Sequence, residues 1–164
     1  MKKHLTISAI FFAAVLAPTM MSTSQLAAQE ASGSTAAPSL DYEFFKTRVE
    51  PIFLKKRPGH ARCYVCHSKV EDRFPGVTFR LQVLAPGSTF WNEEQSQINF
   101  EAVSALVVPG HPTESRFLMH PLASEAGGDV YHHGGKQFAS QDDPDWRTMA
   151  EWARGEKAAG SSKK

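Results

Sequence analysis

The stretch ARCYVCHSKV, residues 61–70, dominates the interpretation of this sequence. It holds Cys63, Cys66 and His67, and the 164-residue chain has no other cysteine. A disulfide between the two thiols would leave the histidine unexplained, and a zinc site would need a fourth ligand and usually more cysteines. A thioredoxin-like redox pair would need a βαβ context, whereas a helical pattern and a loop precede Cys63.

Two cysteines separated by two residues, with a histidine directly after the second, form the attachment pattern for c-type haem. The spacing has a chemical reason, because two neighbouring sulfurs can add across the two vinyl groups on one edge of the porphyrin. The next residue is then carried under the iron, where its imidazole can coordinate. We therefore expect one covalent haem c, with Cys63 and Cys66 as thioether anchors and His67 as the proximal iron ligand.

Residues 1–28 have the layout of a secretory signal peptide. Two lysines precede a mostly apolar run over 5–17, which is too short to span a bilayer comfortably, and small polar residues follow. We expect cleavage after Ala28 and export to the periplasm, although Leu26 stands where a small residue is usual. The alternatives are an uncleaved membrane anchor and a buried N-terminal helix. Cleavage would leave 16 basic and 17 acidic side chains (18 − 2 against 17), a balance that gives no electrostatic case for binding nucleic acid.

The rest of the chain is expected to form one mainly α domain over 41–155, between a flexible linker over 29–40 and a flexible tail over 156–164. Near-helical spacing of apolar residues predicts a helix from Asp41 to about Val49 and another within 93–107. Short helical turns are expected at 113–120, with Thr113 as the cap. The alternating stretch VTFRLQVL, residues 77–84, predicts a short strand that APGST would turn into a hairpin. The clearest helix is DDPDWRTMAEWARG, residues 142–155, with Asp143 as N-cap, Pro144 at its first position and Gly155 at its end.

Three segments together resemble the c-type cytochrome domains common in environmental bacteria, including the planctomycete-type cytochromes. FFKTRVEPIFLKKRPGHARCYVCH, residues 44–67, is similar to the helix with a V-x-P-I-φ pattern (φ being apolar) that leads into C-x-x-C-H. VVPGHPTESRFLMHPLA, residues 107–123, and the last predicted helix are similar to that family's later motifs. The resemblance covers roughly 41–155. It implies a compact, mainly helical, cytochrome c-like domain around a single haem, with an electron-transfer role.

The chain departs from that family at the second axial ligand. Many members carry a Met-Pro segment before the last helix, whereas the corresponding DVYHHGGKQFASQDDPDW, residues 129–146, contains none. His132 is our first choice as distal ligand, because the two glycines after His133 would let the backbone approach a flat macrocycle. His133, His120 and Met119 are alternatives. Met149 is expected to pack in the core, and His60 and His111 to lie at turns or on the surface. Basic side chains that could neutralise haem propionates are Arg62, Lys69, Arg73, Arg80 and Lys136.

The sequence therefore predicts an electron carrier that exchanges single electrons with redox partner proteins, and not an enzyme. Two protein ligands would leave the iron no vacant position, which favours electron transfer over catalysis. An open distal position would favour the alternative, a haem-based sensor or a small peroxidase.

Overall fold

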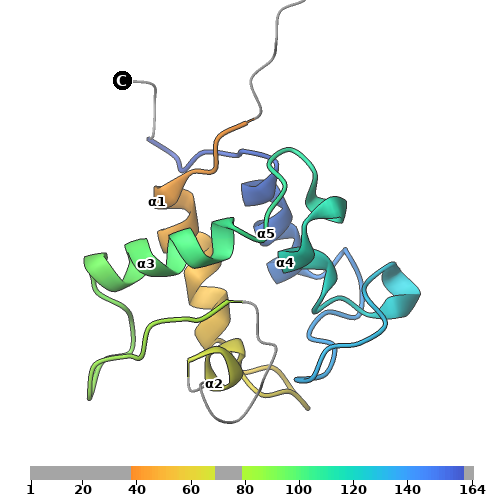
Figure 1. Ribbon diagram of the computed structural model, residues 1–164, viewed down its shortest axis with the longest axis horizontal. Coiled ribbons are helices and arrows are strands. Elements are labelled where there is room, and N and C mark those ends of the chain that lie inside the picture. The colour runs from red at the N-terminus through yellow and green to blue at the C-terminus, as the bar shows by residue number, and fades with distance from the viewer. Residues whose placement is uncertain (1–37, 69–78, 161–164) are drawn as a thin grey trace, which may run out of the picture. The chain divides into compact units, whose positions relative to one another are not determined.

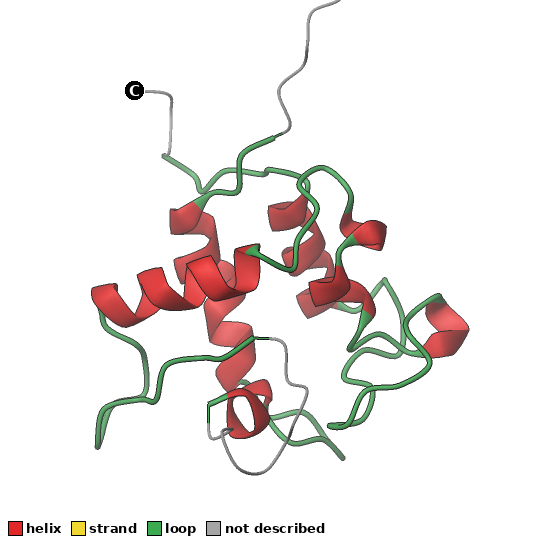
Figure 2. Cartoon of the chain, viewed as in Figure 1, coloured by secondary structure: helices red, strands yellow, loops and turns green. Residues whose placement is uncertain are grey.

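The computed structural model describes residues 38–68 and 79–160, which all belong to one compact unit, Ala36–Lys164. The predicted signal peptide, most of the linker and the last residues of the tail lie outside the described residues. Helical turns and loops make up this part of the chain, and it contains no strand (Figure 2). The mainly α expectation is thus confirmed for the described residues. None of their helices is long and apolar enough to cross a membrane.

The described chain opens with a helical column of changing pitch. Asp41 caps α1 (Tyr42–Phe44), where its carboxylate accepts a hydrogen bond from the Phe44 N–H at 2.7 Å. The column continues as a π-helical turn, η1 (Phe45–Val49), and then as a 3₁₀ turn, η2 (Glu50–Leu54). Pro51 stands at the start of η2, so the predicted break near Val49 is a change of hydrogen-bonding pattern and not an end.

A loop then leads to α2 (Cys63–His67), which comprises the whole CYVCH motif. The longest helix, α3 (Glu93–Ser104), confirms the second predicted helix and crosses the first column (Figure 1). Its N-terminus is closed by a reciprocal capping box between Asn92 and Gln95. Both α3 and the last helix contact η1, and α2 contacts η2. The first column is therefore the element on which α2, α3 and the last helix pack.

The second half of the described chain contains η3 (Pro112–Glu114), α4 (Arg116–Met119), η4 (Ser124–Ala126) and α5 (Pro144–Ala153). Asp143 caps α5 by accepting hydrogen bonds from the N–H groups of Asp145 and Trp146. Gly155 follows the helix with a positive φ of 92°, as expected of a glycine that ends a helix. The predicted boundaries of this helix are confirmed.

The core is an aromatic cluster between the first column and α5. Trp152 is fully buried, packs against Phe45 with ring centroids 5.2 Å apart, and donates its indole N–H to the Asp41 carbonyl at 2.9 Å. Trp146 likewise donates to the carbonyl of Leu118 in α4 at 3.2 Å. Each indole thus buries a large apolar surface and also satisfies a backbone group from a distant segment.

The predicted hairpin is wrong where it can be compared. Residues 79–84 pair with no other strand, and 77–78 lie outside the described residues. The only isolated bridge in the described part joins Leu122 to Phe138. Alternation in sequence does not make a strand unless a neighbouring segment offers a ladder of backbone hydrogen bonds. Here the backbone groups of this segment bond to the side chains of Asn99, Tyr64 and Trp91 and to the His67 carbonyl.

The predicted cap at Thr113 is also wrong. Thr113 lies inside the 3₁₀ turn η3, and α4 begins after Ser115. The Ser115 side chain does not cap α4. It accepts a hydrogen bond from the Val108 N–H at 2.9 Å and donates to the His111 carbonyl at 2.8 Å, so it closes the loop before the helix.

A half-buried ion-pair network joins the loop before α2 to the start of α5. Arg57 makes two hydrogen bonds to the Asp143 carboxylate, at 2.9 and 3.1 Å, and also pairs with Asp145. Its guanidinium carbon lies 4.5 Å from the ring centre of Phe138. Burial tends to raise the pKa of Asp143, but the Arg57 guanidinium and the N–H of Asp145 outweigh that effect and lower it.

We predict that Asp143→Ala lowers the free energy of unfolding at pH 7 by about 2 kcal/mol, because it removes both an N-cap and the partner of Arg57. Since the folded-state pKa of Asp143 is lowered, its contribution is complete above the ordinary aspartate pKa of about 3.9 and is lost as the pH falls through the lowered value. Urea titrations at pH 7 and near pH 3 measure this. Asp142→Ala, at the exposed neighbouring aspartate, is the control. An Asp143→Ala effect that is equal at both pH values would contradict the prediction.

Candidate functional site

The CYVCH helix forms one wall of a mostly apolar cavity. The cavity contains about 990 Å³ of non-atom space, part of it open to solvent. Cys63, Cys66 and His67 all line it, and so do side chains from segments far apart in sequence. Its apolar walls include Phe53, Phe79, Leu106, Phe117, Phe138 and Met149. The structure thus brings all three predicted attachment residues to one hollow.

His67 is held as an oriented, neutral imidazole. Its Nδ1 lies 3.2 Å from the Phe79 carbonyl oxygen, and since that oxygen can only accept, Nδ1 carries the proton and Nε2 the lone pair. The ring stacks on the Phe79 ring with centroids 4.0 Å apart. Burial is the main cause that lowers the pKa of His67 to about 4. An imidazole fixed in this way is poised to coordinate through Nε2.

The two thiols are free and are not joined to each other. Burial raises the pKa of the Cys63 thiol to about 11, so it is protonated at neutral pH. Gly134 lies across from Cys66, and a Cβ built on this glycine would be 3.9 Å from the Cys66 sulfur. The loop after His133 therefore passes close to α2.

The predicted distal residue His132 lines the cavity and is half-buried. Its Nδ1 donates to the Gly135 carbonyl at 2.6 Å, and the Gly135 N–H donates back to the His132 carbonyl at 2.9 Å. Gly135 adopts a positive φ of 73°, which a residue with a Cβ would disfavour. The tight turn thus fixes the imidazole with its Nε2 as the nitrogen that is left for coordination.

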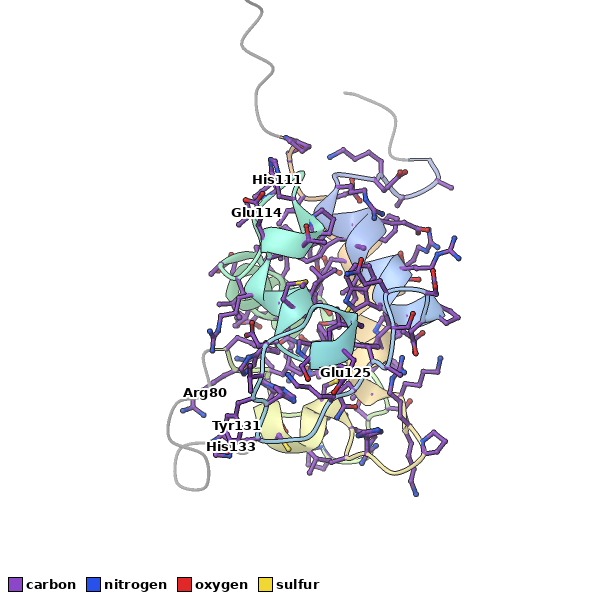
Figure 3. The ribbon with its side chains drawn as sticks, turned by 90° about the vertical axis from the view of Figure 1, so that its right-hand side faces the viewer. Arg80, His111, Glu114, Glu125, Tyr131 and His133 are labelled. Atoms are coloured by element: carbon purple, nitrogen blue, oxygen red, sulfur yellow. The ribbon has the colours of Figure 1, made fainter. Side chains whose placement is uncertain are left out.

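His120, which ends α4, is a second imidazole at the cavity. Its Nδ1 lies 2.7 Å from the Asp129 carboxylate, and its ring meets the His132 ring edge-on with centroids 4.9 Å apart. His133 also lines the cavity and hydrogen-bonds with the hydroxyl of Tyr131 at 2.7 Å (Figure 3). The structure therefore brings three of the four predicted distal candidates to the cavity.

The fourth distal candidate, Met119, is not part of the cavity lining. Met149, which was expected in the core, is buried and contributes to the lining. His60 is also not in the lining, and His111 lies beside Glu114 at the end of the unit opposite α2 (Figure 3).

Two arginines, Arg62 and Arg116, contribute to the cavity lining. Arg116 could not be singled out from the sequence. It belongs to no motif, and it reaches the cavity only because of how α4 packs. Of the other predicted cations, Arg80 is not in the lining, and Lys136 donates to the carbonyls of His120 and Asp129. Lys69 and Arg73 lie outside the described residues.

One residue of the lining has a buried polar atom without a partner among the described residues. Gln137 is 7% exposed and lines the cavity, and its side-chain oxygen makes no hydrogen bond there. No three histidine, cysteine, aspartate or glutamate side chains of the described part converge to hold a bare metal ion. The chemistry on offer is a pair of adjacent thiols, oriented imidazoles and apolar walls. This set suits a flat, largely apolar ligand that is anchored at one edge.

We predict that Gly135→Ala destabilises the protein by about 1 kcal/mol, because Ala must adopt a positive φ, and that it also disturbs the His132 ring. The matched control is Gly87→Ala, since Gly87 has a similar φ of 80° but is not part of the cavity lining. Urea unfolding measures the cost, and NMR of the imidazole nitrogens measures the ring. Equal changes at His132 in both variants would contradict the assignment.

No protein-family model, no curated protein and no solved structure matches this chain.

Proposed function

We propose that this protein is an exported c-type cytochrome with one covalent haem and a cytochrome c-like fold, and that it carries single electrons between redox partner proteins. One observation carries the proposal: Cys63, Cys66 and His67 lie together on the wall of a large apolar cavity. The motif alone could occur on a surface loop. Its place at a hollow lined by aromatic side chains is what haem attachment requires.

The cavity residues fit haem on three further counts. The His67 Nδ1–H is bonded to a backbone carbonyl at 3.2 Å, which is the usual support of a metal-binding histidine. The neutral imidazole and the free thiols are in the chemical states that coordination and thioether formation start from. The unpaired oxygen of Gln137 is a polar group that a bound ligand or water could satisfy.

Each side chain then has a defined task. Cys63 and Cys66 would anchor the macrocycle, and His67 would present Nε2 to the iron. Arg62 and Arg116 are the arginines of the lining that would neutralise propionates, and the aromatic walls would exclude water. Haem, when bound, supplies an iron that cycles between ferric and ferrous states. The chain contributes attachment, orientation and a low-dielectric cover.

His132 is the proposed distal ligand. It lines the same cavity as His67, and its Nδ1 is occupied by the Gly135 carbonyl at 2.6 Å, which leaves Nε2 available. The turn that carries it also passes near Cys66. His120, supported by Asp129, and His133 are the other imidazoles within the cavity lining. A ligand set of two imidazoles gives a lower potential than a set of histidine and methionine.

The proposal is tested first by the mass of the protein exported from cells that have a haem-attachment system. We expect the mature chain after signal cleavage plus one haem, bound to a peptide that contains Cys63 and Cys66. Cys63→Ala combined with Cys66→Ala should abolish covalent attachment, because no other thiol exists in the chain. An unmodified wild-type mass, or full covalent haem on the double variant, would refute the proposal.

Visible and near-infrared spectra of both oxidation states test the distal ligand. We expect low-spin c-type bands without the long-wavelength ferric band of a methionine–iron bond. His132→Ala should turn the ferric spectrum high-spin and allow cyanide to bind at least ~10-fold more tightly, since the distal position opens. His133→Ala is the matched control from the same turn and should leave the spectrum unchanged.

Other outcomes identify other ligands or another function. If the spectrum of His132→Ala is unchanged and that of His120→Ala is high-spin, His120 is the distal ligand. A methionine–iron band in the wild type would point to a methionine. A wild-type protein that is high-spin and binds carbon monoxide rapidly would favour the haem-based sensor or small peroxidase over the electron carrier.

A further inference from the structure

A buried polar cluster lies outside the cavity, and none of its residues contributes to the cavity lining. Glu50, at the start of η2, is 4% exposed, and Ser96 and Asn99 on α3 are fully buried. The Ser96 hydroxyl donates to one Glu50 carboxylate oxygen at 2.7 Å, and the Asn99 amide nitrogen donates to the other at 2.8 Å. Burying three polar side chains together costs free energy unless each of them is hydrogen-bonded. We therefore asked what this cluster holds in place.

Asn99 connects this cluster to the segment that holds His67. Its side-chain oxygen accepts a hydrogen bond from the Gln82 N–H at 2.7 Å. One residue before, the Leu81 N–H donates to the His67 carbonyl at 2.9 Å, and three residues before Gln82 the Phe79 carbonyl accepts from His67 Nδ1. The amide of Asn99 therefore links the buried carboxylate to the chain segment on which the imidazole depends.

Residues 79–84 have no strand partner, so apart from the backbone bond between Leu81 and His67 their position depends on side chains. The Trp91 indole N–H donates to the Gln82 carbonyl at 2.6 Å, and the Tyr64 hydroxyl accepts from the Leu84 N–H at 3.1 Å. Asn99 differs from these two because it is fully buried and its own orientation is dictated. Its nitrogen must face the Glu50 carboxylate, so its oxygen must face Gln82.

We propose that Asn99, oriented by Glu50, is a positioning residue for His67: it holds the 79–82 segment so that the Phe79 carbonyl keeps its hydrogen bond to the imidazole. This inference rests on the proposed haem function. The hydrogen bond at Nδ1 makes the imidazole a stronger donor to the iron and so favours the ferric state. Loosening the segment should weaken that bond and shift the equilibrium toward ferrous iron, which raises the potential.

The experiment compares two buried variants of the haem-loaded protein. Asn99→Leu keeps the approximate volume but removes the bonds to both Glu50 and Gln82. Ser96→Ala is the matched control, because it also takes a donor from Glu50 at a fully buried position of the same helix but makes no hydrogen bond to 79–82. If Asn99→Leu does not fold, Asn99→Ser replaces it, since the shorter side chain cannot reach Gln82.

The readouts are the potential and the NMR resonance of the His67 Nδ1 proton, neither of which responds to stability alone. For Asn99→Leu we expect the equilibrium constant for reduction to rise at least about three-fold. At 59 mV per tenfold this raises the potential by about 28 mV. The Nδ1 resonance should shift as well. Ser96→Ala should leave both readouts unchanged while it destabilises the protein.

The outcomes separate this inference from the function on which it rests. Suppose that the wild type carries haem, but the potential and the Nδ1 resonance are the same in Asn99→Leu or change equally in Ser96→Ala. This result overturns the positioning role alone. A wild-type protein without covalent haem overturns the proposed function itself. Slower amide exchange at Gln82 in the wild type than in Asn99→Leu supports the role of Asn99 in holding the segment.

Discussion

The hydrogen bond from His67 Nδ1 to the Phe79 carbonyl is the interaction on which the site depends. An imidazole that is buried in an apolar hollow loses its charge, and only a bond at one ring nitrogen decides which nitrogen remains to act. The acceptor is a backbone atom of a segment without a strand partner. The orientation of the His67 ring therefore depends on α3 and on the first helical column. Asn99 of α3 bonds to this segment, and Glu50 of the column bonds to Asn99.

Local features of this fold could be predicted from sequence where the signal is itself local. Asp143 with Pro144 marks the start of α5, and Gly155 marks its end, because caps and prolines act within a few residues. Asp41 caps the first helix for the same reason. The CYVCH motif could be singled out because cysteine is scarce in the chain and the pattern is chemically restrictive. Its place at a cavity required the structure.

Other features could not be predicted because they depend on distant partners. The alternation within 77–84 describes side chains, whereas a strand needs a second segment to pair with, and none is present for 79–84. Ser96 and Asn99 look like surface residues of an amphipathic helix, yet they are buried because Glu50 lies opposite. Arg116 carries no motif, and only the docking of α4 brings it to the cavity.

The cavity walls come from residues that span Phe53 to Met149, and the indole of Trp152 bonds back to Asp41, 111 positions earlier. Such contacts close very long chain loops, which makes folding slow relative to helical proteins with local contacts. The hollow is complete only when α5 has docked. A chain that emerges from its N-terminus first therefore presents CYVCH in an open, unfolded form before any pocket exists. This order leaves the thiols accessible before the hollow is complete, which is when the proposed haem attachment would take place.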